Sequence, residues 1–527
     1  MPNAIELILK IHPDYIFDES YIKNSIRKKV DFQNFTYKVL KRSIDARGKQ
    51  PFYVVKVQVE ESLHSQSMQN DTFENKYVFK DVRNSPEVII IGFGPAGMFA
   101  ALECLLQGLK PVVFERGKKV RPRRRDLANI TKNQIVNPDS NYCFGEGGAG
   151  TFSDGKLYTR SHKRGNVNKI LELLVLHGAS EDILIDAHPH IGTNKLPKVV
   201  EAIRETILHY GGEIHFESKL TDIFYENNTL TGIQINDENT VKCNHLVLAT
   251  GHSARDIYRL LAKRNIVLEP KPFAVGVRAE HPQQLIDAAQ YHCPVRHPNL
   301  PPASYKLVQQ VKGLGVYSFC MCPGGIVAPC ATEPGEIVTN GWSPSKRNNP
   351  FANSGIVVSV TDEMLVPLAE KYGVLAGVAF QEKIEKTAFA LAGNDVENNF
   401  GQIAPAQRLS DFLRKKKSNN LPLVSYRPGV ESVELHEVLP TEISVRLQEA
   451  FKIFGKKIKG YTSEEAMLIA PETRTSAPVR IPRKKETFEH IQIKGLYPSG
   501  EGAGYAGGII SAAIDGEKVV QAIAGQL

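Results

Sequence analysis

The chain has 527 residues, which is too long for one ordinary hydrophobic core and predicts two or three domains. Hydrophobic residues make up 42% of the sequence and charged residues 23%, as in folded proteins, which excludes a disordered chain. The net charge of +8 is modest for this length, and no apolar run is long enough to span a bilayer, so we expect no membrane partner.

Neither the N-terminal sequence nor the cysteine content indicates a secreted protein. The first fifteen residues alternate apolar and polar side chains and include acids, unlike a signal peptide, so a cytoplasmic location is expected. The seven cysteines are odd in number, widely spaced and contain no CxxC pair. This argues against a disulfide framework, a thioredoxin-like couple and a zinc ribbon, and we expect no metal site.

Residues 1–85 are predicted to form a small N-terminal α+β domain. The alternation in IELILKI predicts a strand, and residues 19–30 suit an amphipathic helix with Tyr21, Ile22, Ile26 and Val30 facing inward. YKVLKRSI and PFYVVKVQVE then predict two strands joined by the turn DARGKQ, and KYVFKD is a candidate for one more strand. A βαββ order of this kind is typical of a ferredoxin-like unit.

The sequence changes character at Pro86, where a strand, a glycine-rich turn, a helix and a second strand follow one another. The turn is Gly92-Phe93-Gly94-Pro95-Ala96-Gly97, directly after the apolar residues 88–91. In this context Gly92 allows a tight turn, Gly94 lets a pyrophosphate approach the backbone, and Gly97 lets helix and strand pack. The helix N-terminus offers free N–H groups to phosphates. Glu115 ends the second strand, 18 residues after Gly97, where a carboxylate can bind ribose hydroxyls.

Two later segments complete the pattern. Residues 246–251, LVLATG, form an apolar strand ending in Thr250 and Gly251, after a run of predicted hairpin strands. Near the C-terminus, residues 495–508 contain a glycine cluster with one acid, Glu501, and lead into a small-residue helix. This is a second turn suited to phosphate.

These three segments together resemble the FAD-binding proteins of the glutathione-reductase type, over residues 85–270 and 485–527. The resemblance implies one non-covalently bound FAD, with Glu501 facing the ribityl chain and pyrophosphate, Gly507 and Gly508 starting a helix that points at the flavin, and Leu220 near the adenine. The cofactor-binding residues expected from the pattern and the resemblance are Gly92, Gly94, Pro95, Ala96, Gly97, Glu115, Arg116, Gly148, Gly150, Thr151, Lys156, Leu220, Thr250, Gly251, Gly500, Glu501, Gly507 and Gly508.

A narrower resemblance rests on FGEGGAGTFSDGKL (144–157), FCMCPGG (319–325), NGWSPSKRNNPFANSGIVV (340–358) and PETRTSAPVRI (471–481). These segments are similar to bacterial proteins described as FAD-dependent dehydrogenases. The resemblance implies that residues 147–156 lie against the isoalloxazine ring.

Candidates for the reaction itself are less specific. Cys320 and Cys322 flank one residue, and on a regular strand their side chains would face opposite ways, so Cys322 is either a buried structural thiol or a thiol near the flavin. His190, with His188, is a candidate acid or base or a satisfied core residue. Arg474 is a candidate clamp for a carboxylate or phosphate, or a surface residue pairing with Glu472. We rank Arg474, His190 and Cys322 as the predicted catalytic residues.

A basic cluster, Lys118, Lys119, Arg121, Arg123, Arg124 and Arg125, is interpreted as a solvated loop, or alternatively as a site attracting an anionic cofactor, substrate or RNA. In residues 1–85 basic residues exceed acidic ones by only three, which argues against a nucleic-acid module. The sequence contains no second βαβ unit for NAD(P)H, so a nicotinamide reductant would dock transiently.

The predicted fold is α/β with α+β parts: a Rossmann-like FAD-binding domain (86–272 and 485–527), an inserted mixed α+β substrate or cap domain (273–484), and the ferredoxin-like unit 1–85. The predicted function is that of an FAD-dependent oxidoreductase, a dehydrogenase or reductase acting on a small organic substrate. The alternatives are a flavin mono-oxygenase using transiently docked NAD(P)H, and an RNA- or protein-binding flavoprotein related to tRNA modification. The sequence names neither the substrate nor the oligomeric state.

Overall fold

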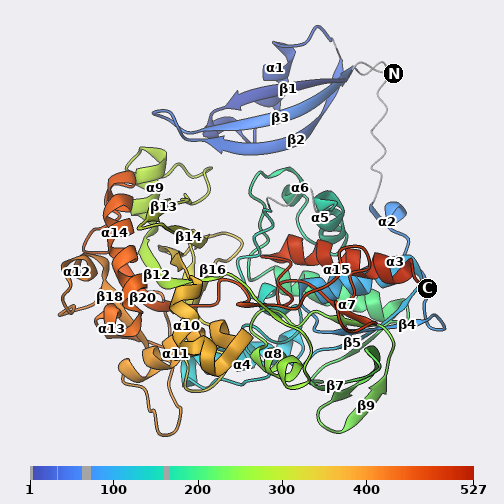
Figure 1. Ribbon diagram of the computed structural model, residues 1–527. Helices are drawn as coiled ribbons and strands as arrows, with labels where there is room; N and C mark the ends of the chain where they lie inside the picture. The colour runs from blue at the N-terminus through green and yellow to red at the C-terminus, as the bar shows by residue number, and fades with distance from the viewer. Residues whose placement is uncertain (1–3, 33, 62–72, 160–164) are drawn as a thin grey trace.

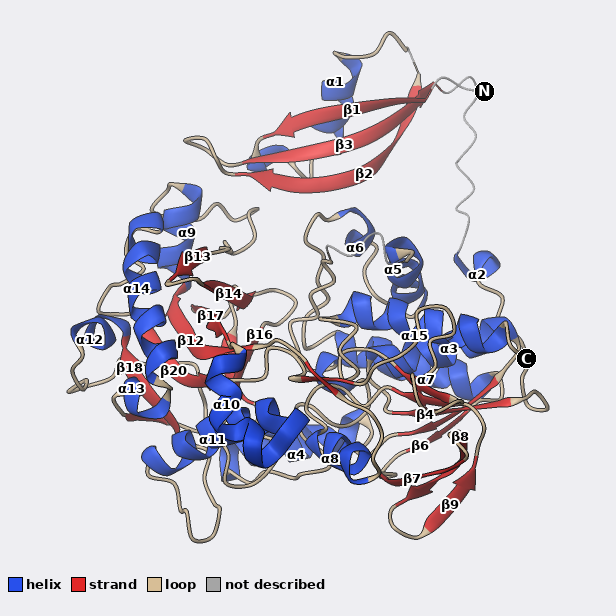
Figure 2. Ribbon diagram, viewed as in Figure 1, coloured by secondary structure: helices blue, strands red, loops and turns tan. Residues whose placement is uncertain are grey.

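A computed structural model describes residues 4–32, 34–61, 73–159 and 165–527. Figures 1 and 2 show an N-terminal sheet, a sheet-and-helix body formed by residues 87–263 together with the C-terminal residues 496–524, and a second body built around a larger sheet. The α/β fold with α+β parts is confirmed. Among the helices of the described residues, none is both long and apolar enough to cross a membrane.

The N-terminal unit is a three-stranded antiparallel sheet in the order β1-β3-β2, with one helix. Its elements are β1 Ala4–Ile11, α1 Glu19–Arg27, β2 Phe35–Asp45 and β3 Phe52–Glu61. Asp18 caps α1 by accepting a hydrogen bond from the Tyr21 N–H, and Ile22 and Ile26 are the residues that α1 buries. The βαββ order and the inward face of the helix agree with the sequence prediction, and the strand order matches that of a ferredoxin-like unit lacking its last strand.

The predicted strand KYVFKD (76–81) is wrong. Lys76 ends a short helix, α2 Phe73–Lys76, and residues 77–81 pair with no strand. Their backbone is engaged elsewhere, because the Lys80 N–H donates to the Leu105 carbonyl and the Val82 N–H to the Tyr210 carbonyl. The segment therefore runs along the neighbouring body instead of completing the N-terminal sheet.

The FAD-type body contains a five-stranded, all-parallel sheet in the order β22-β10-β4-β5-β6. Its strands are β4 Glu87–Ile91, β5 Lys110–Phe114, β6 Glu213–His215, β10 Leu246–Leu248 and β22 Leu496–Pro498. Strand β22 therefore joins the sheet from the far end of the chain. The predicted strand–turn–helix–strand of residues 86–116 and the LVLATG strand are confirmed.

Both faces of this sheet are covered, as a parallel sheet requires. On one face lie α3 Pro95–Gln107, α5 Val167–Leu176, α7 Leu196–His209 and α15 Ile509–Ala524. On the other face lie α8 Arg255–Lys263 and the antiparallel sheet of β7 Leu220–Glu226, β8 Thr229–Ile235 and β9 Asn239–Lys242. Alternate residues of β4 serve the two faces: Val88 and Ile90 pack in the helix core, and Ile89 and Ile91 pack in the opposite core.

Two further helices, α4 Val120–Asn133 and α6 Asp182–Ile185, complete the segment between β5 and β6. The N-terminal unit is tied to this segment by Arg42, whose guanidinium donates to Asp186 at 2.8 Å and to Asp182 at 3.0 Å. It is tied to the third body by the Tyr53 hydroxyl, which donates to the Asn299 carbonyl at 2.6 Å.

The third body is built on a seven-stranded mixed sheet in the order β13-β14-β17-β12-β20-β18-β19. Its strands are β12 Ala274–Pro282, β13 Val308–Val311, β14 Leu314–Cys322, β17 Phe351–Ser359, β18 Ala404–Arg408, β19 Val430–Ser432 and β20 Met467–Glu472. Its helices are α9 Gln283–Tyr291, α10 Asp362–Tyr372, α11 Ala376–Leu391, α12 Leu409–Arg414, α13 Leu435–Val438 and α14 Thr441–Lys457.

Two small two-stranded sheets are separate from the seven-stranded sheet. One is the antiparallel pair β15 Ile326–Pro329 and β16 Thr339–Trp342. The other joins β11 Glu269–Pro270 to β21 Val479–Arg480, the strands that precede and follow the large sheet in the chain. This second pair brings the two ends of the intervening segment together, as expected for a segment inserted into another domain.

Candidate active site

The turn between β4 and α3 has the geometry that its glycines predicted. Gly92 has a φ of +96°, and a Cβ on it would lie 2.5 Å from the Ala249 carbonyl oxygen. A Cβ on Gly97 would lie 1.9 Å from the Gly92 carbonyl oxygen, so only glycine lets α3 approach the turn. Gly94 is the N-cap of α3 and provides no side-chain cap, so the first N–H groups of the helix face outward without a capping partner.

The C-terminal glycine turn meets the first one. A Cβ on Gly500 would lie 2.8 Å from the Ala96 Cβ, and one on Gly516, in α15, would lie 2.1 Å from the Ala96 carbonyl oxygen. Helices α3 and α15 therefore pack backbone to backbone. Gly508, the N-cap of α15, has a φ of +146° and provides no side-chain cap either. Two uncapped helix N-termini thus converge, although the turns are about four hundred residues apart in sequence.

A cavity of about 400 Å³ lies where the two turns meet. The predicted cofactor-binding residues that line it are Gly92, Gly94, Pro95, Ala96, Glu115, Arg116, Gly148, Gly150, Lys156, Leu220, Thr250, Gly251, Glu501, Gly507 and Gly508, together with the predicted catalytic residue Arg474. Gly97, Thr151 and Gly500 lie directly behind this wall as packing residues, and His190 and Cys322 also lie behind it.

Glu115 is almost fully buried at the end of β5 and organises three glycine-containing segments at once. One carboxylate oxygen accepts the Phe93 N–H at 2.8 Å, and the other accepts the N–H groups of Gly117 and Gly145, each at 2.9 Å. A carboxylate has about four acceptor positions, so one remains for a ribose hydroxyl. The predicted contact of Glu115 with ribose stays a prediction, and the structure adds that this residue shapes the cavity wall itself.

Arg116 lies beside Glu115 on the same wall. Its guanidinium pairs with Asp139 at 2.7 Å and with Asp256 at 3.0 Å, and it stacks 4.3 Å from the centre of the Phe144 ring. These contacts fix a positive charge just after the carboxyl end of β5, where it would attract an anionic cofactor.

The predicted flavin loop, residues 147–156, is held by a residue that the sequence reading assigned to a solvated loop. Arg123 is fully buried in α4, and its guanidinium donates to the carbonyl oxygens of residues 141, 142, 146 and 148 at 2.8–3.0 Å. The prediction that the basic cluster forms a loop is therefore wrong. Its four arginines lie in α4, and Lys118 and Lys119 directly precede that helix. Its periodicity shows the reason, because Arg123 shares the buried face of α4 with Val120 and Leu127.

These features fit a dinucleotide. The uncapped N–H groups of α3 and α15 suit a diphosphate, and the approach of Gly148 to Gly94, where a Cβ would lie 2.9 Å from the Gly94 Cα, leaves a cradle that side chains would fill. Glu501 also faces this cavity, and burial raises its pKa to about 7. Its carboxyl group is therefore partly protonated at neutral pH, which reduces the repulsion between Glu501 and a nearby phosphate.

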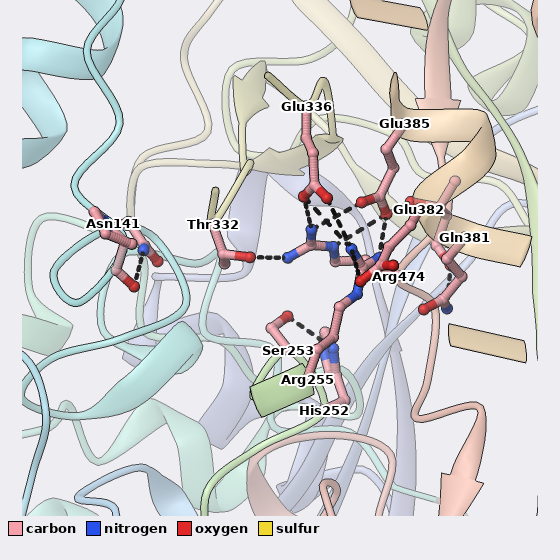
Figure 3. A network of polar contacts seen from close by, with 12 residues as sticks. Asn141, His252, Ser253, Arg255, Thr332, Glu336, Gln381, Glu382, Glu385 and Arg474 are labelled. Carbon is pink, nitrogen blue, oxygen red and sulfur yellow. Dashed lines mark hydrogen bonds and ion pairs between the residues drawn. The ribbon is translucent and has the colours of Figure 1, made fainter. Parts of the chain in front are cut away.

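Arg474 is buried in the cavity wall, within the network of charges drawn in Figure 3. Its guanidinium pairs with Glu336 and Glu385, each at 2.9 Å, and Arg255 pairs with the same Glu385 at 2.7 Å. The expected surface position and the pairing with Glu472 are wrong, because Arg474 is buried and pairs with Glu336 and Glu385. Arg474 lines the cavity, its Nη1 donates to the Thr332 hydroxyl, and its role as a clamp for a substrate anion stays a prediction.

Strand β14 brings Cys320 and Cys322 to the same cation, contrary to the sequence expectation. The Lys156 ammonium lies 3.6 Å from the Cys320 Sγ and 3.2 Å from the Cys322 Sγ. The strand is irregular here: Cys320 has a φ of +45°, and the pairing with β17 shifts register between Phe319 and Cys322. This bulge breaks the alternation of side chains that a regular strand would impose.

His190 lies behind Lys156, with which it forms an isolated antiparallel bridge, and its Nε2 is 3.1 Å from the Ser345 carbonyl oxygen. Burial and the nearby Arg347 lower its pKa, so its imidazole is neutral at neutral pH. A direct role in the reaction stays a prediction for this residue.

Sequence reasoning missed several residues of the cavity wall: Tyr142, Cys143, His252, Ser253, Cys330, Asn340 and Trp342. His252 had a usable signal, because it follows the LVLATG strand directly. Burial, reinforced by Arg474 and Arg255, lowers its pKa to about 4. Asn340 and Trp342 of β16 lie in the segment 340–358 that carries the narrower resemblance, but nothing in the sequence placed them at the cavity. Cys330, which follows β15, had no signal, because its distance from the glycine turns in sequence hides its proximity in space.

Two parts of the chain match known protein families, and one relative matches nearly all of it. Residues 272–475 match the family "FAD-dependent protein, C-terminal domain-like", and residues 1–60 match a domain of unknown function. A protein of Clostridium beijerinckii, named only as an uncharacterized protein, is 44% identical over 500 residues, which cover 92% of this chain and 91% of that one.

Three solved structures are similar to this chain in fold. They are CtdE in complex with FAD (12% identity, 84% of this chain and 85% of that one, TM-score 0.33), the flavin-dependent brominase Bmp2 (13%, 84% and 79%, 0.36) and glycine oxidase from Bacillus cereus (12%, 84% and 96%, 0.31).

The identity to the Clostridium protein extends over nearly the whole of both chains, and the matched C-terminal family is defined as FAD-dependent. The chain therefore belongs to the same family as that Clostridium protein and carries the C-terminal domain of an FAD-dependent protein.

Proposed function

We propose that this protein passes electrons between bound FAD and a small organic substrate, as a dehydrogenase or reductase related to the glutathione-reductase type. The observation that carries the proposal is that one cavity has walls from two bodies. The glycine turns of the parallel-sheet body supply one side, and Phe319, Cys320 and Trp342 from the large-sheet body line the same space. A cofactor held by the first wall would meet a substrate held by the second.

In this proposal the α3 N-terminus binds the diphosphate and the α15 N-terminus points at the flavin. Glu115 and Leu220 bind the adenosine, and residues 147–156 lie against the ring system. FAD supplies the two-electron chemistry, and the protein supplies position and electrostatics. The buried network of Arg474 supports the wall near Thr250 and Gly251. Cys320 and Lys156 occupy the part of the wall that faces a substrate, and Cys322 lies behind them. The neutral His190 supports Lys156 from behind.

The divided arrangement supports treating residues 273–484 as a substrate or cap domain between the two parts of an FAD-binding domain, 86–272 and 485–527, with residues 1–85 as a separate unit. NAD(P)H enters the proposal only as a transiently docked reductant, since the sequence carries one dinucleotide-binding βαβ unit.

The test is anaerobic reduction of the purified holoprotein. The protein is expected to be yellow, with the oxidised flavin band near about 450 nm. We expect one class among NADH, NADPH and a panel of organic acids, amines, thiols and alcohols to bleach this band. A protein that stays colourless after addition of FAD would refute the proposal. A donor-dependent reaction that inserts oxygen into a substrate in air would replace it with a mono-oxygenase.

A further inference from the structure

The thiol pair at the end of β14 is unusual in its placement. Cys320 is partly exposed in the cavity wall and Cys322 is fully buried behind it, yet both sulfur atoms contact Lys156. Lys156 ends the loop that is expected to lie against the flavin. The positive φ of Cys320, a conformation that non-glycine residues adopt at a cost of order 1–3 kcal/mol, is what turns the two side chains together.

The charged side chains around the two thiols carry one more positive charge than negative charge. Two cations contact the pair, Lys156 and Arg278, whose Nη2 lies 3.6 Å from the Cys322 Sγ, and a third, Arg347, belongs to the same group through Asp154. Two carboxylates balance them: Asp154 pairs with Lys156 at 3.3 Å and with Arg347 at 2.9 Å.

The second carboxylate, Glu472, pairs with Arg278 at 2.8 Å, and burial raises its pKa to about 7. Glu501, which also faces Cys320 across the cavity, has a pKa raised in the same way. The imidazole of His190 is neutral. A thiolate is therefore the missing negative charge in this group, because uncompensated buried cations are costly.

The two cysteines divide the roles of a thiolate and its partner. The hydrogen bond from Cys322, followed by Lys156 and Arg278, holds the pKa of Cys320 well below its usual value. Burial and the same hydrogen bond raise the pKa of Cys322 well above its usual value. The geometry agrees with this division: Cys320 is the thiol that a substrate in the cavity can reach, and the buried Cys322 Sγ donates its proton to the Cys320 carbonyl oxygen at 3.3 Å.

We propose that Cys320 and Cys322 form a redox-active dithiol that exchanges an electron pair with FAD, so that the substrate is a thiol or disulfide compound. This inference rests on the proposed function, because it requires FAD in the cavity. In the oxidising direction, the Cys320 thiolate and the Cys322 thiol form one Sγ–Sγ bond, Cys322 loses its proton, and the two electrons and one proton pass to FAD. In the other half of the cycle, one substrate thiol attacks the Cys320 Sγ and releases the Cys322 thiol, and a second substrate thiol attacks the mixed disulfide, releases the Cys320 thiolate and a proton, and leaves with the first as a disulfide. The electron pair on the flavin passes to a transiently docked oxidised nicotinamide.

The first experiment counts electrons in the holoprotein. The protein is oxidised with oxidised glutathione, freed of it by gel filtration, and titrated anaerobically with dithionite while the flavin band is followed. The wild type is expected to take up about four electrons per FAD, two for the flavin and two for the disulfide, and Cys320→Ser or Cys322→Ser about two. Cys293→Ser, which changes a thiol in the large-sheet body away from the pair, should behave as the wild type.

Uptake of about two electrons by the wild type, equal to that of the serine variants, would overturn the proposal. A chain that binds no FAD would instead refute the proposed function, and this outcome is distinguishable because the second experiment does not need the cofactor.

The second experiment measures the reactivity of Cys320 in the reduced protein without added FAD. Labelling by iodoacetamide at about pH 7 is followed by mass spectrometry, with Cys293 as the internal reference. An ordinary thiol with a pKa of ~8.5 is only about 3% thiolate at this pH, so Lys156→Met should slow labelling of Cys320 by up to about 30-fold. Lys156→Arg, which keeps the charge, should retain most of the rate. Labelling of Cys320 no faster than that of Cys293 in the wild type would contradict a stabilised thiolate.

Discussion

The close contact between helices α3 and α15 can be tested by adding one methyl group at Gly516. In Gly516→Ala, the new Cβ would lie 2.1 Å from the Ala96 carbonyl oxygen, 2.9 Å from the Ala96 carbonyl carbon and 3.2 Å from the Ala100 nitrogen. All three atoms are backbone atoms of α3, so no side chain can rotate away. The two helices must separate by about 1 Å to restore an ordinary contact.

The expected magnitude follows from two opposed effects. Overpacking of a close interface costs about 1–3 kcal/mol, and replacing a helical glycine by alanine returns up to about 1 kcal/mol of helix propensity. We expect a net loss of about 1–2 kcal/mol in the free energy of unfolding. The α3 N-terminus is expected to bind the diphosphate and the α15 N-terminus to point at the flavin, so separating the two helices should also weaken FAD binding by about ten-fold for each 1.4 kcal/mol of binding free energy lost.

The assay is urea unfolding of the apo-protein together with FAD titration by quenching of flavin fluorescence. Gly525→Ala is the matched control, because it lies at the end of the same helix and its Cβ would make only ordinary contacts, the nearest at 3.6 Å. If Gly516→Ala binds FAD as tightly as Gly525→Ala and is equally stable, the two helices do not meet as described and the convergence of the two glycine turns is refuted.

Three further substitutions test other parts of the site. Glu385→Gln removes a carboxylate from the buried network around Arg474 and should cost about 3–5 kcal/mol in urea unfolding, whereas Arg259→Gln, in an exposed pair, should cost less than about 1 kcal/mol; equal losses would contradict the buried network. Glu115→Gln places an amide against backbone N–H donors, so FAD affinity, measured as flavin retained on dialysis, should fall about ten-fold or more, and full retention would count against that role. Because the pKa of Glu501 is raised to about 7, this residue is neutral below that pH and charged above it, so the Kd for FAD should increase as pH rises through about 7 in the wild type and stay flatter in Glu501→Gln; superimposable pH profiles would exclude the effect.

Local sequence signals predicted the cofactor half of this molecule well. The strand, glycine turn and helix of residues 87–107 are specified by neighbours within a few residues, because glycines with a positive φ or a close backbone contact leave few alternatives. The C-terminal turn is of the same kind. Their meeting in one cavity was a prediction about long-range structure, and the structure confirms it.

The catalytic half could not be predicted in the same way. The partners of Arg474 lie 89 and 138 residues away in sequence, so no local pattern identifies Glu385 and Glu336. Cys320 and Cys322 were expected on opposite faces because regular strands alternate, and a single residue with a positive φ removes that rule. The segment KYVFKD has the composition of a strand, but its backbone partners belong to another body.

The position of β22 next to β10 has a consequence for how the protein acquires its cofactor during biosynthesis. Strands β4, β5, β6 and β10 emerge from the ribosome well before residues 496–524, and until then the outer edge of β10 and the face of α3 that packs on α15 lack their partners. FAD loading is therefore expected to wait until residues 496–524 have been synthesised and have folded onto the earlier strands. Nascent chains arrested before Leu496 should accumulate without flavin, however complete their earlier domains are.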